Sequence, residues 1–126
     1  MMSRPNILIV DDEFGLAETL GEVLATMGYE VSIAVNGKLG LASVQQSRPD
    51  AILLDVMMPV MTGPEMLAAL RAAEDYHDIP VILMSALVSQ ATLDEVRPSI
   101  TDFLQKPFTI EQLKSALGKV CPDGPS

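Results

Sequence analysis

The chain has 126 residues, a length typical of one domain, and its 8 Lys+Arg against 17 Asp+Glu give a formal net charge of −9. This charge repels phosphate backbones and anionic lipids, so we expect no direct binding to nucleic acid or to a membrane surface. The lone histidine, His77, excludes a multi-histidine metal site, and the lone cysteine, Cys121, cannot form an internal disulfide. Because no apolar run is long enough for a signal peptide or a membrane span, we expect a cytoplasmic protein.

Short aliphatic runs alternate along the chain with segments of helical spacing. Consecutive apolar residues rich in Val and Ile are typical, over so short a length, of strands that are buried on both faces. These runs are 7–10, 31–35, 51–54, 81–84 and a weaker one at 103–104.

The first two helical segments follow the first two strands. The first segment has one apolar face, and Gly28 is expected to end it. That face consists of Leu16, Leu20, Val23, Leu24 and Met27. The second segment, 38–46, has a less regular stripe because Gly40 interrupts it.

Two more helices follow the third and fourth strands. A capping-box pattern from Thr62 to Glu65, with proline in the first turn, opens a helix that runs through Ala73. The next helix, 90–97, is short and ends against Pro98.

The last helix opens with a second capping-box pattern, from Thr109 to Gln112. Phe108, before the cap, can pack on Leu113 as a hydrophobic staple. Its apolar face is expected to be Ile110, Leu113, Leu117 and Val120.

Five strands alternating with five helices predict an α/β fold, a doubly wound parallel sheet with helices on both faces. We assign one domain to residues 5–120, and the composition of 121–126 is that of a frayed tail or the start of a linker. Sheets of this kind bind ligands at the carboxyl ends of their strands, so the residues that follow each strand are the candidate site.

Acidic and phosphate-binding residue types stand at these strand ends. Asp11 and Asp12 follow the first strand, Asp55 follows the third, Ser85 the fourth and Lys106 the fifth. If the first and third strands are neighbours, their carboxylates converge, and they need positive charge to offset their repulsion. Lys106 supplies one charge, and all-oxygen ligands predict Mg²⁺ as the other.

A carboxylate beside Mg²⁺, a lysine and a hydroxyl can carry out phosphoryl transfer. An aspartate can act as the nucleophile and form an aspartyl-phosphate without a general base. Cationic groups and a hydroxyl donor offset the charge on the phosphoryl oxygens.

Four motifs, in this order and at these separations, resemble the receiver domains of two-component response regulators. They are Ile-Leu-Ile-Val-Asp-Asp-Glu at 7–13, Leu-Leu-Asp-Val-Met-Met-Pro at 53–59 with Gly63, Ser85-Ala86, and Lys106-Pro107-Phe108. The resemblance spans about residues 5 to 120 and implies a flavodoxin-like strand order, 2-1-3-4-5.

The resemblance also implies a role for each residue of the acidic group. Asp55 matches the phosphoacceptor, and Asp11 and Asp12 match the acidic pair that holds Mg²⁺, with Asp12 the more direct ligand. Met57 matches the position that gives the metal a main-chain carbonyl.

Further roles are implied for the ends of the fourth and fifth strands. Ser85 matches the hydroxyl that contacts the phosphoryl group, Lys106 matches the lysine that pairs with it, and Pro107 implies a cis peptide bond. Phe103 matches the aromatic residue that changes rotamer on phosphorylation, and Ser85 belongs to the same switch.

The function implied is a signalling receiver, not an enzyme, although it assists its own Mg²⁺-dependent phosphotransfer and dephosphorylation. A histidine kinase or phosphotransfer protein would donate the phosphoryl group, and a downstream protein would bind the face formed by the fourth helix, fifth strand and fifth helix. The chain is either a stand-alone receiver or a part of a longer regulator or hybrid kinase.

Other interpretations of the same residues stay open at this point. Asp11 and Asp12 can cap the first helix, and Phe103 can be a half-buried strand residue. A degenerate receiver, acting as a phosphorylation-independent interaction module, is the main alternative function. A haloacid-dehalogenase type of phosphatase is disfavoured, because it needs a second acid where Met57 stands, and a flavin or nucleotide carrier would need a glycine- or hydroxyl-rich phosphate loop after the first strand. Pro98, Ser99 and Ile100 depart from the common receiver pattern before the fifth strand.

Overall fold

Strands and helices alternate without exception in the computed structural model, which describes residues 4–122 and Gly124. In chain order these elements are β1 (Asn6–Val10), α1 (Phe14–Thr26), β2 (Glu30–Ala34), α2 (Gly37–Gln46), β3 (Ala51–Asp55), α3 (Gly63–Ala72), β4 (Val81–Ser85), α4 (Gln90–Val96), a 3₁₀ turn (Arg97–Ser99), β5 (Asp102–Gln105) and α5 (Ile110–Val120). All strand pairs are parallel, in the order β2-β1-β3-β4-β5. The predicted doubly wound α/β fold is confirmed.

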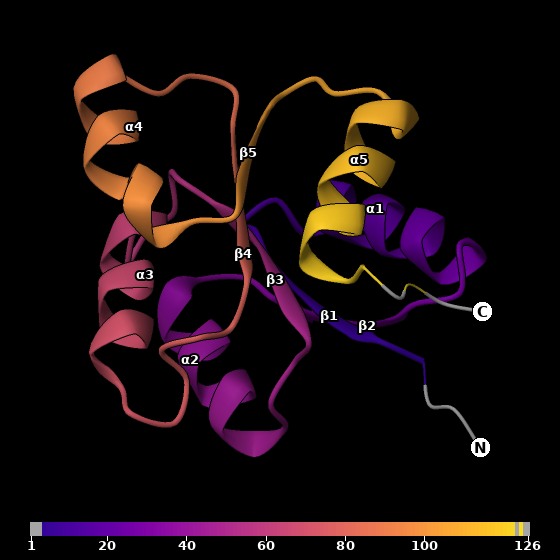
Figure 1. Cartoon of the computed structure of the whole chain (residues 1–126), viewed down its shortest axis with the longest axis horizontal. Coiled ribbons are helices and arrows are strands. Elements are labelled where there is room, and N and C mark those ends of the chain that lie inside the picture. Colours follow the sequence, from indigo (N-terminus) through magenta and orange to yellow (C-terminus); the bar gives the residue numbers. More distant parts are fainter. Residues whose placement is uncertain (1–3, 123, 125–126) are drawn as a thin grey trace.

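Two helical layers cover the sheet: α1 and α5 lie on one face, and α2, α3 and α4 lie on the other (Figure 1). The central strands are buried throughout because alternate residues point to opposite faces. In β1, Ile7 and Ile9 pack toward α1 and α5, whereas Leu8 and Val10 pack toward the other layer. This explains why the sequence shows continuous apolar runs there instead of alternation.

Side-chain caps fix the start of four helices. Asn36, Thr62, Ser89 and Thr109 each accept a hydrogen bond from the backbone N–H three residues ahead. Both predicted capping boxes are present, at the starts of α3 and α5. At the other end of α1, Gly28 has a φ of +100° and allows the chain to turn into β2.

Two residues of the expected apolar faces are exposed, which corrects the prediction. Leu16 of α1 is 53% exposed and Ile110 of α5 is 45% exposed. Both lie in the first turn of their helix, at the carboxyl end of the sheet, where helical periodicity continues but the sheet no longer provides a surface to bury it. Ala17 and Gly21 are buried against the sheet instead, and a side chain at Gly21 would meet Val31.

The two less regular helices form, with altered limits. The irregular stripe of α2 has a packing cause: a Cβ atom at Gly40 would lie 2.9 Å from Met66 Cε. The α-helical part of α4 ends at Val96, and Arg97, expected as its last residue, begins the 3₁₀ turn. Among the helices of the described residues, none is both long and apolar enough to cross a membrane.

The expected domain, 5–120, contains all of these elements. The start of the expected tail forms a turn, in which the Gly124 N–H donates to the Cys121 carbonyl at 2.9 Å. The remainder of the tail lies outside the described residues.

Candidate functional site

The predicted site residues stand at the carboxyl ends of four strands and are held there by the sheet. Asp55 and Ser85 are the last residues of β3 and β4. Asp11 and Lys106 directly follow β1 and β5, and their backbone N–H groups extend the ladder by donating to Ala34 and Ser85 at 3.0 and 2.8 Å. The backbone positions of the site are therefore fixed by sheet hydrogen bonds.

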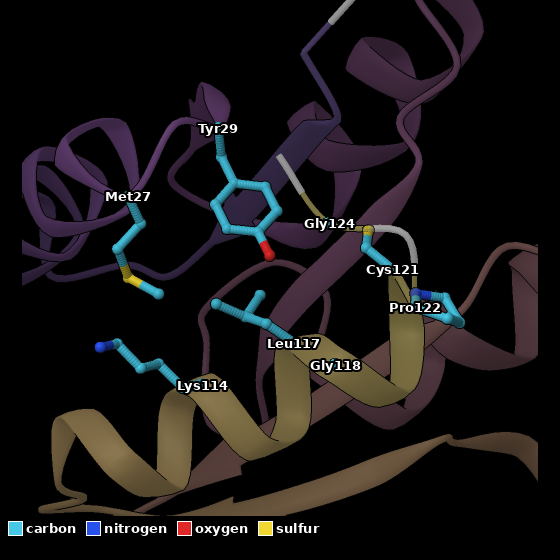
Figure 2. A pocket seen from close by; sticks show the side chains of 8 residues that line it. All are labelled: Met27, Tyr29, Lys114, Leu117, Gly118, Cys121, Pro122 and Gly124. Atoms are coloured by element: carbon cyan, nitrogen blue, oxygen red, sulfur yellow. The ribbon is translucent and has the colours of Figure 1, made fainter. Parts of the chain in front are cut away.

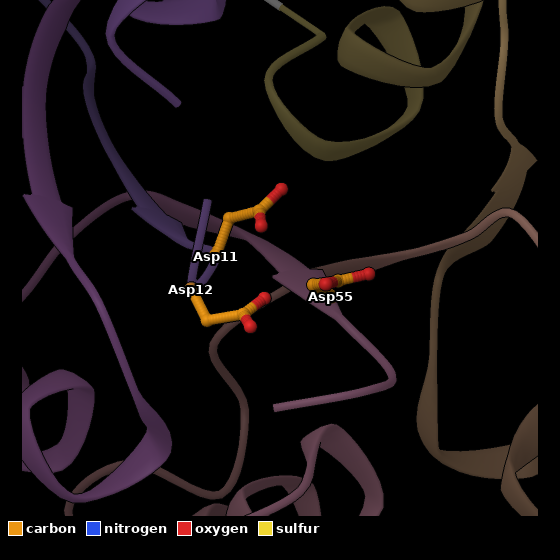
Figure 3. Close-up of side chains that lie close together, drawn as sticks. All are labelled: Asp11, Asp12 and Asp55. Atoms are coloured by element: carbon orange, nitrogen blue, oxygen red, sulfur yellow. The ribbon is translucent and has the colours of Figure 1, made fainter. Parts of the chain in front are cut away.

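The three predicted acidic residues meet. Asp11, Asp12 and Asp55 each offer a carboxylate oxygen, and these oxygens lie within 4.8 Å of one another. Figure 3 shows Asp12 pointing toward Asp55, with Asp11 beside them. Asp11 and Asp55 are buried whereas Asp12 is exposed, so the group is open to solvent on one side.

Lys106 forms the cationic side of the site. Its Nζ lies 2.8 Å from Asp11 Oδ2 and 3.5 Å from Asp55 Oδ1. Burial lowers the pKa of Lys106, but the hydrogen bond and charge of Asp11 and the charge of Asp55 outweigh burial and leave the pKa raised. Lys106 is therefore protonated and positively charged at neutral pH. The predicted cis peptide bond between Lys106 and Pro107 is also present.

One lysine does not neutralise this group. Burial raises the pKa of Asp55 to about 6; Lys106 opposes the shift, while the charges of Asp11 and Asp12 add to it. The pocket therefore carries excess negative charge near neutral pH. Hard carboxylate oxygens with one open side fit Mg²⁺, which binds through a few carboxylates and retains water.

The alternative role of Asp11 and Asp12 as helix caps is not what the structure contains. Glu13 is the N-cap residue of α1, and no side chain of the described residues caps this helix. Asp11 Oδ1 instead accepts the backbone N–H of Glu13 at 3.0 Å, which shapes the loop and leaves the other oxygen for Lys106.

Ser85 is buried, and its hydroxyl is used locally. Ser85 Oγ donates to the carbonyl of Leu87 at 2.7 Å and accepts the backbone N–H of Leu87 at 3.1 Å. The hydroxyl therefore stabilises the turn between β4 and α4 and must exchange these bonds to contact another group.

The loop from β3 to α3 contains two features that the sequence analysis missed. Val60 has a φ of +70°, which is disfavoured for a β-branched residue, and the Met61 N–H donates to the Pro59 carbonyl at 2.7 Å across it. At Gly63 a Cβ atom would lie 2.2 Å from the Asp55 carbonyl oxygen. Gly63 was identified within a motif, but no periodicity could reveal this close approach, and nothing in the sequence marks the strain at Val60.

Met57 and Phe103 lie outside the acidic group. The side chain of Met57 is exposed, so only its main chain is placed by the turn that follows Asp55. Phe103 is half-buried, pairs in register with Leu83, and packs against the core on the side of α2, α3 and α4. This position fits both the packing role and the switch role considered for Phe103.

A hollow of about 370 Å³ lies elsewhere, between the end of α1 and the end of α5 (Figure 2). It is lined by Met27, Tyr29, Lys114, Leu117, Gly118, Cys121, Pro122 and Gly124. Burial raises the pKa of both the Tyr29 hydroxyl and the Cys121 thiol, so neither group is activated there. None of the predicted site residues lines this hollow.

Comparisons with known proteins agree with this geometry. Residues 7–118 match the family model of the response regulator receiver domain. The transcriptional regulatory protein PrrA of Mycobacterium leprae is 36% identical over 116 residues, which are 89% of this chain and 48% of PrrA. The chain thus spans about half the length of that relative.

Two further matches cover nearly the whole length of both this chain and the matched protein. Sporulation initiation phosphotransferase F of Bacillus subtilis is 36% identical over 123 residues, 96% of this chain and 97% of the relative. The structure of the chemotaxis protein CheY4 of Vibrio cholerae has a TM-score of 0.87 and 34% identity, covering 94% of this chain and 99% of that protein. The chain belongs to the response regulator receiver domain family, the signalling domain of two-component and phosphorelay systems.

Proposed function

We propose that this receiver accepts a phosphoryl group on Asp55 from a phosphohistidine of a histidine kinase or phosphotransfer protein. The observation that carries the proposal is the convergence of Asp11, Asp12 and Asp55 beside Lys106 at one end of the sheet. The donor identity rests on the family, whose members act with such partners. A cytoplasmic location and a functional domain at 5–120 are parts of the same proposal.

Four residues would hold Mg²⁺: Asp11, Asp12 and Asp55 through carboxylate oxygens, and Met57 through its main-chain carbonyl. When bound, the ion supplies positive charge to the phosphoryl oxygens and to the acidic group. The excess negative charge of the pocket and its open side at Asp12 support this assignment.

The chemical step needs only the carboxylate of Asp55 as nucleophile. An oxygen of Asp55 bonds to phosphorus, the P–N bond of the phosphohistidine breaks, and its electron pair returns to the imidazole nitrogen. Lys106, which is charged and already 3.5 Å from Asp55 Oδ1, is placed to pair with the transferred group.

Phosphorylation would then favour a second arrangement of the β4–α4 region. Ser85 would exchange its bond to the Leu87 carbonyl for one to a phosphoryl oxygen, and Phe103 would turn toward the space that opens. The face formed by α4, β5 and α5 would change shape and bind a downstream protein. The main alternative is a degenerate receiver, and the proposal is preferred to it because the charged side chains that the reaction uses lie together at one site.

Incubation with acetyl phosphate and Mg²⁺, followed by intact mass measurement, tests the proposal. We expect the wild type and Asp94→Asn to gain one phosphoryl group, and Asp55→Asn to gain none. Asp94 is a suitable control because it is an exposed carboxylate on α4, away from the acidic group. Equal gains in Asp55→Asn would place the acceptor elsewhere, and no gain in a folded wild type would favour the degenerate receiver.

A further inference from the structure

Arg71, in the last turn of α3, joins three segments at the amino end of the sheet. Its Nε and Nη2 both donate to the Ser99 carbonyl, at 3.0 and 2.7 Å. Its Nη1 donates to the carbonyls of His77 and Ile79, both at 2.9 Å. The guanidinium thus ties α3 to the loop before β4 and to the link between α4 and β5.

This link is where α4 is attached to the rest of the domain. The helix has seven residues, and Val96, at its carboxyl-terminal end, is its buried residue. Its opposite end is exposed at Ser89, Gln90 and Ala91, and Figure 1 shows α4 at one end of the layer that it forms with α2 and α3. The carbonyl that Arg71 holds lies three residues beyond Val96. We therefore call the Val96 end of α4 its fixed end and the exposed end, at Ser89–Ala91, its free end; Val88, just before the free end, still packs against the core.

The fixed end is held from both sides. The Thr101 N–H donates to the Val81 carbonyl at 2.8 Å, which ties the link to β4, while Arg71 ties it to α3. Two guanidinium nitrogens directed at one carbonyl also define its orientation, which a lysine ammonium cannot reproduce. A charged donor makes such hydrogen bonds roughly twice as strong as neutral ones.

We infer that Arg71 is a positioning residue for the switch: it holds residues 97–101 in place, so that α4 turns about this end when Asp55 is phosphorylated. The inference rests on the proposed function. The change that begins at Ser85 and Leu87 then reaches α4 at its free end and is converted into a rotation of the helix. Without the Arg71 contacts the whole segment would loosen instead.

Amide hydrogen exchange in the wild type, Arg71→Met, Arg71→Lys and Arg48→Met, with and without acetyl phosphate and Mg²⁺, tests this. Arg48 is the matched control because it also holds the loop before β4, through Asp78 at 2.8 Å and the Asp75 carbonyl, but has no hydrogen bond to the link among the described residues. The reporting amides are those of Arg97, Ile100 and Thr101, which are hydrogen-bonded in the structure.

In the wild type we expect phosphorylation to change exchange in 87–92 and to leave the reporting amides unchanged. In Arg71→Met these amides should exchange roughly tenfold faster or more without phosphate, and phosphorylation should now affect them too. Arg71→Lys should fall between, because an ammonium can reach some of the carbonyls. Arg48→Met should leave them as in the wild type.

The outcomes separate this inference from the proposed function. Intact mass of the same samples reports phosphorylation; a folded wild type that takes no phosphate would overturn both proposals. If phosphorylation is normal, two results would overturn the inference alone. One is that the reporting amides exchange at the same rate in Arg71→Met as in Arg48→Met. The other is that phosphorylation of the wild type changes exchange in 97–101 as much as in 87–92. Amide exchange in β3 reports whether each variant keeps the global fold. If Arg71→Met does not fold, the reporting amides of Arg71→Lys, compared with those of the wild type, test the inference instead.

Discussion

The two ends of the sheet differ in how their charged groups are balanced: carboxylates are in excess at the carboxyl end, whereas Arg48 and Arg71 at the amino end have hydrogen-bonding partners. At the carboxyl end, Asp11, Asp12 and Asp55 face a single lysine, and burial with mutual repulsion raises the pKa of Asp55 to about 6. At the amino end, the guanidinium of Arg48 pairs with Asp78 and that of Arg71 is surrounded by carbonyls.

Backbone conformation and exposure differ in the same direction. The carboxyl end contains the positive φ of Val60, and Met57 and Leu87 expose large apolar side chains there. Strain, unbalanced charge and exposed apolar surface are all costs to folding, and they concentrate where ligands and partners can offset them.

The largest expected effect comes from Gly63→Ala, which alters the packing of α3 against the backbone of Asp55 and Val56. The added Cβ atom would lie 2.2 Å from the Asp55 carbonyl oxygen and 3.0 Å from Val56 Cα, and both are backbone atoms that cannot turn aside. We expect the free energy of unfolding in urea to fall by about 3 kcal/mol or more.

Gly118→Ala is the matched control, because a Cβ atom there meets nothing within 4 Å and the residue lies inside α5. That variant should gain about 0.5–1 kcal/mol from helix propensity. Similar effects of the two substitutions would show that the close approach at Gly63 does not constrain the loop.

Removing one negative charge should stabilise the acidic end. At pH 7 without Mg²⁺, we expect Asp55→Asn to raise the free energy of unfolding by about 2 kcal/mol, because the folded state holds this carboxylate at a raised pKa. Asp94→Asn, on the exposed surface of α4, should change stability by less than about 0.5 kcal/mol.

The sign of the pH dependence follows from the same pKa. Below the ordinary value of 3.8, Asp55 is protonated in both folded and unfolded states and contributes nothing; between 3.8 and about 6 the folded state binds more protons, so stability falls as pH rises. The wild type and Asp55→Asn should therefore converge in acid and separate toward neutral pH. Saturating Mg²⁺ should narrow the gap by stabilising the wild type. A gap of constant size across this range would contradict the assignment.

Sequence reasoning predicted the acidic end better than the amino end, for a physical reason. Asp55 and Ser85 end buried strands and Lys106 directly follows β5, and the topology of a parallel sheet brings strand ends together whatever the details of packing. The contacts of Arg71 depend instead on carbonyls of two loops, 6 to 28 residues away along the chain, and carbonyls leave no trace in side-chain patterns.

Helical periodicity in the sequence also failed to predict burial at the carboxyl end of the sheet. Leu16 and Ile110 continue the apolar faces of α1 and α5, but they lie in first turns where the sheet ends. Periodicity reports which face a residue occupies, not whether a partner surface exists opposite it. The positive φ of Val60 and the contact at Gly63 are likewise set by how α3 packs back onto β3, which only three-dimensional structure reveals.

The smallest expected effect concerns the free end of α4, which begins at the carboxyl end of the sheet. Ser89 caps this helix by accepting the Thr92 N–H at 3.1 Å, so Ser89→Ala should lose about 1 kcal/mol of local stability, a roughly fivefold increase in amide exchange over 92–95. Because α4 buries only Val96 among its residues, its opening need not disrupt the sheet, and global stability should fall by less than about 0.5 kcal/mol.

Thr109→Ala removes an equivalent cap from α5, which buries Leu113, Ala116, Leu117 and Val120 against the sheet. There the same loss, about 1 kcal/mol, should appear in global unfolding. Equal global losses in the two variants would mean that α4 unfolds only with the whole domain. A helix that cannot open or turn by itself could not respond at one end while Arg71 holds the other. The difference in global stability loss between Ser89→Ala and Thr109→Ala therefore tests whether α4 can move at the acidic end of the sheet while its other end stays fixed at the amino end.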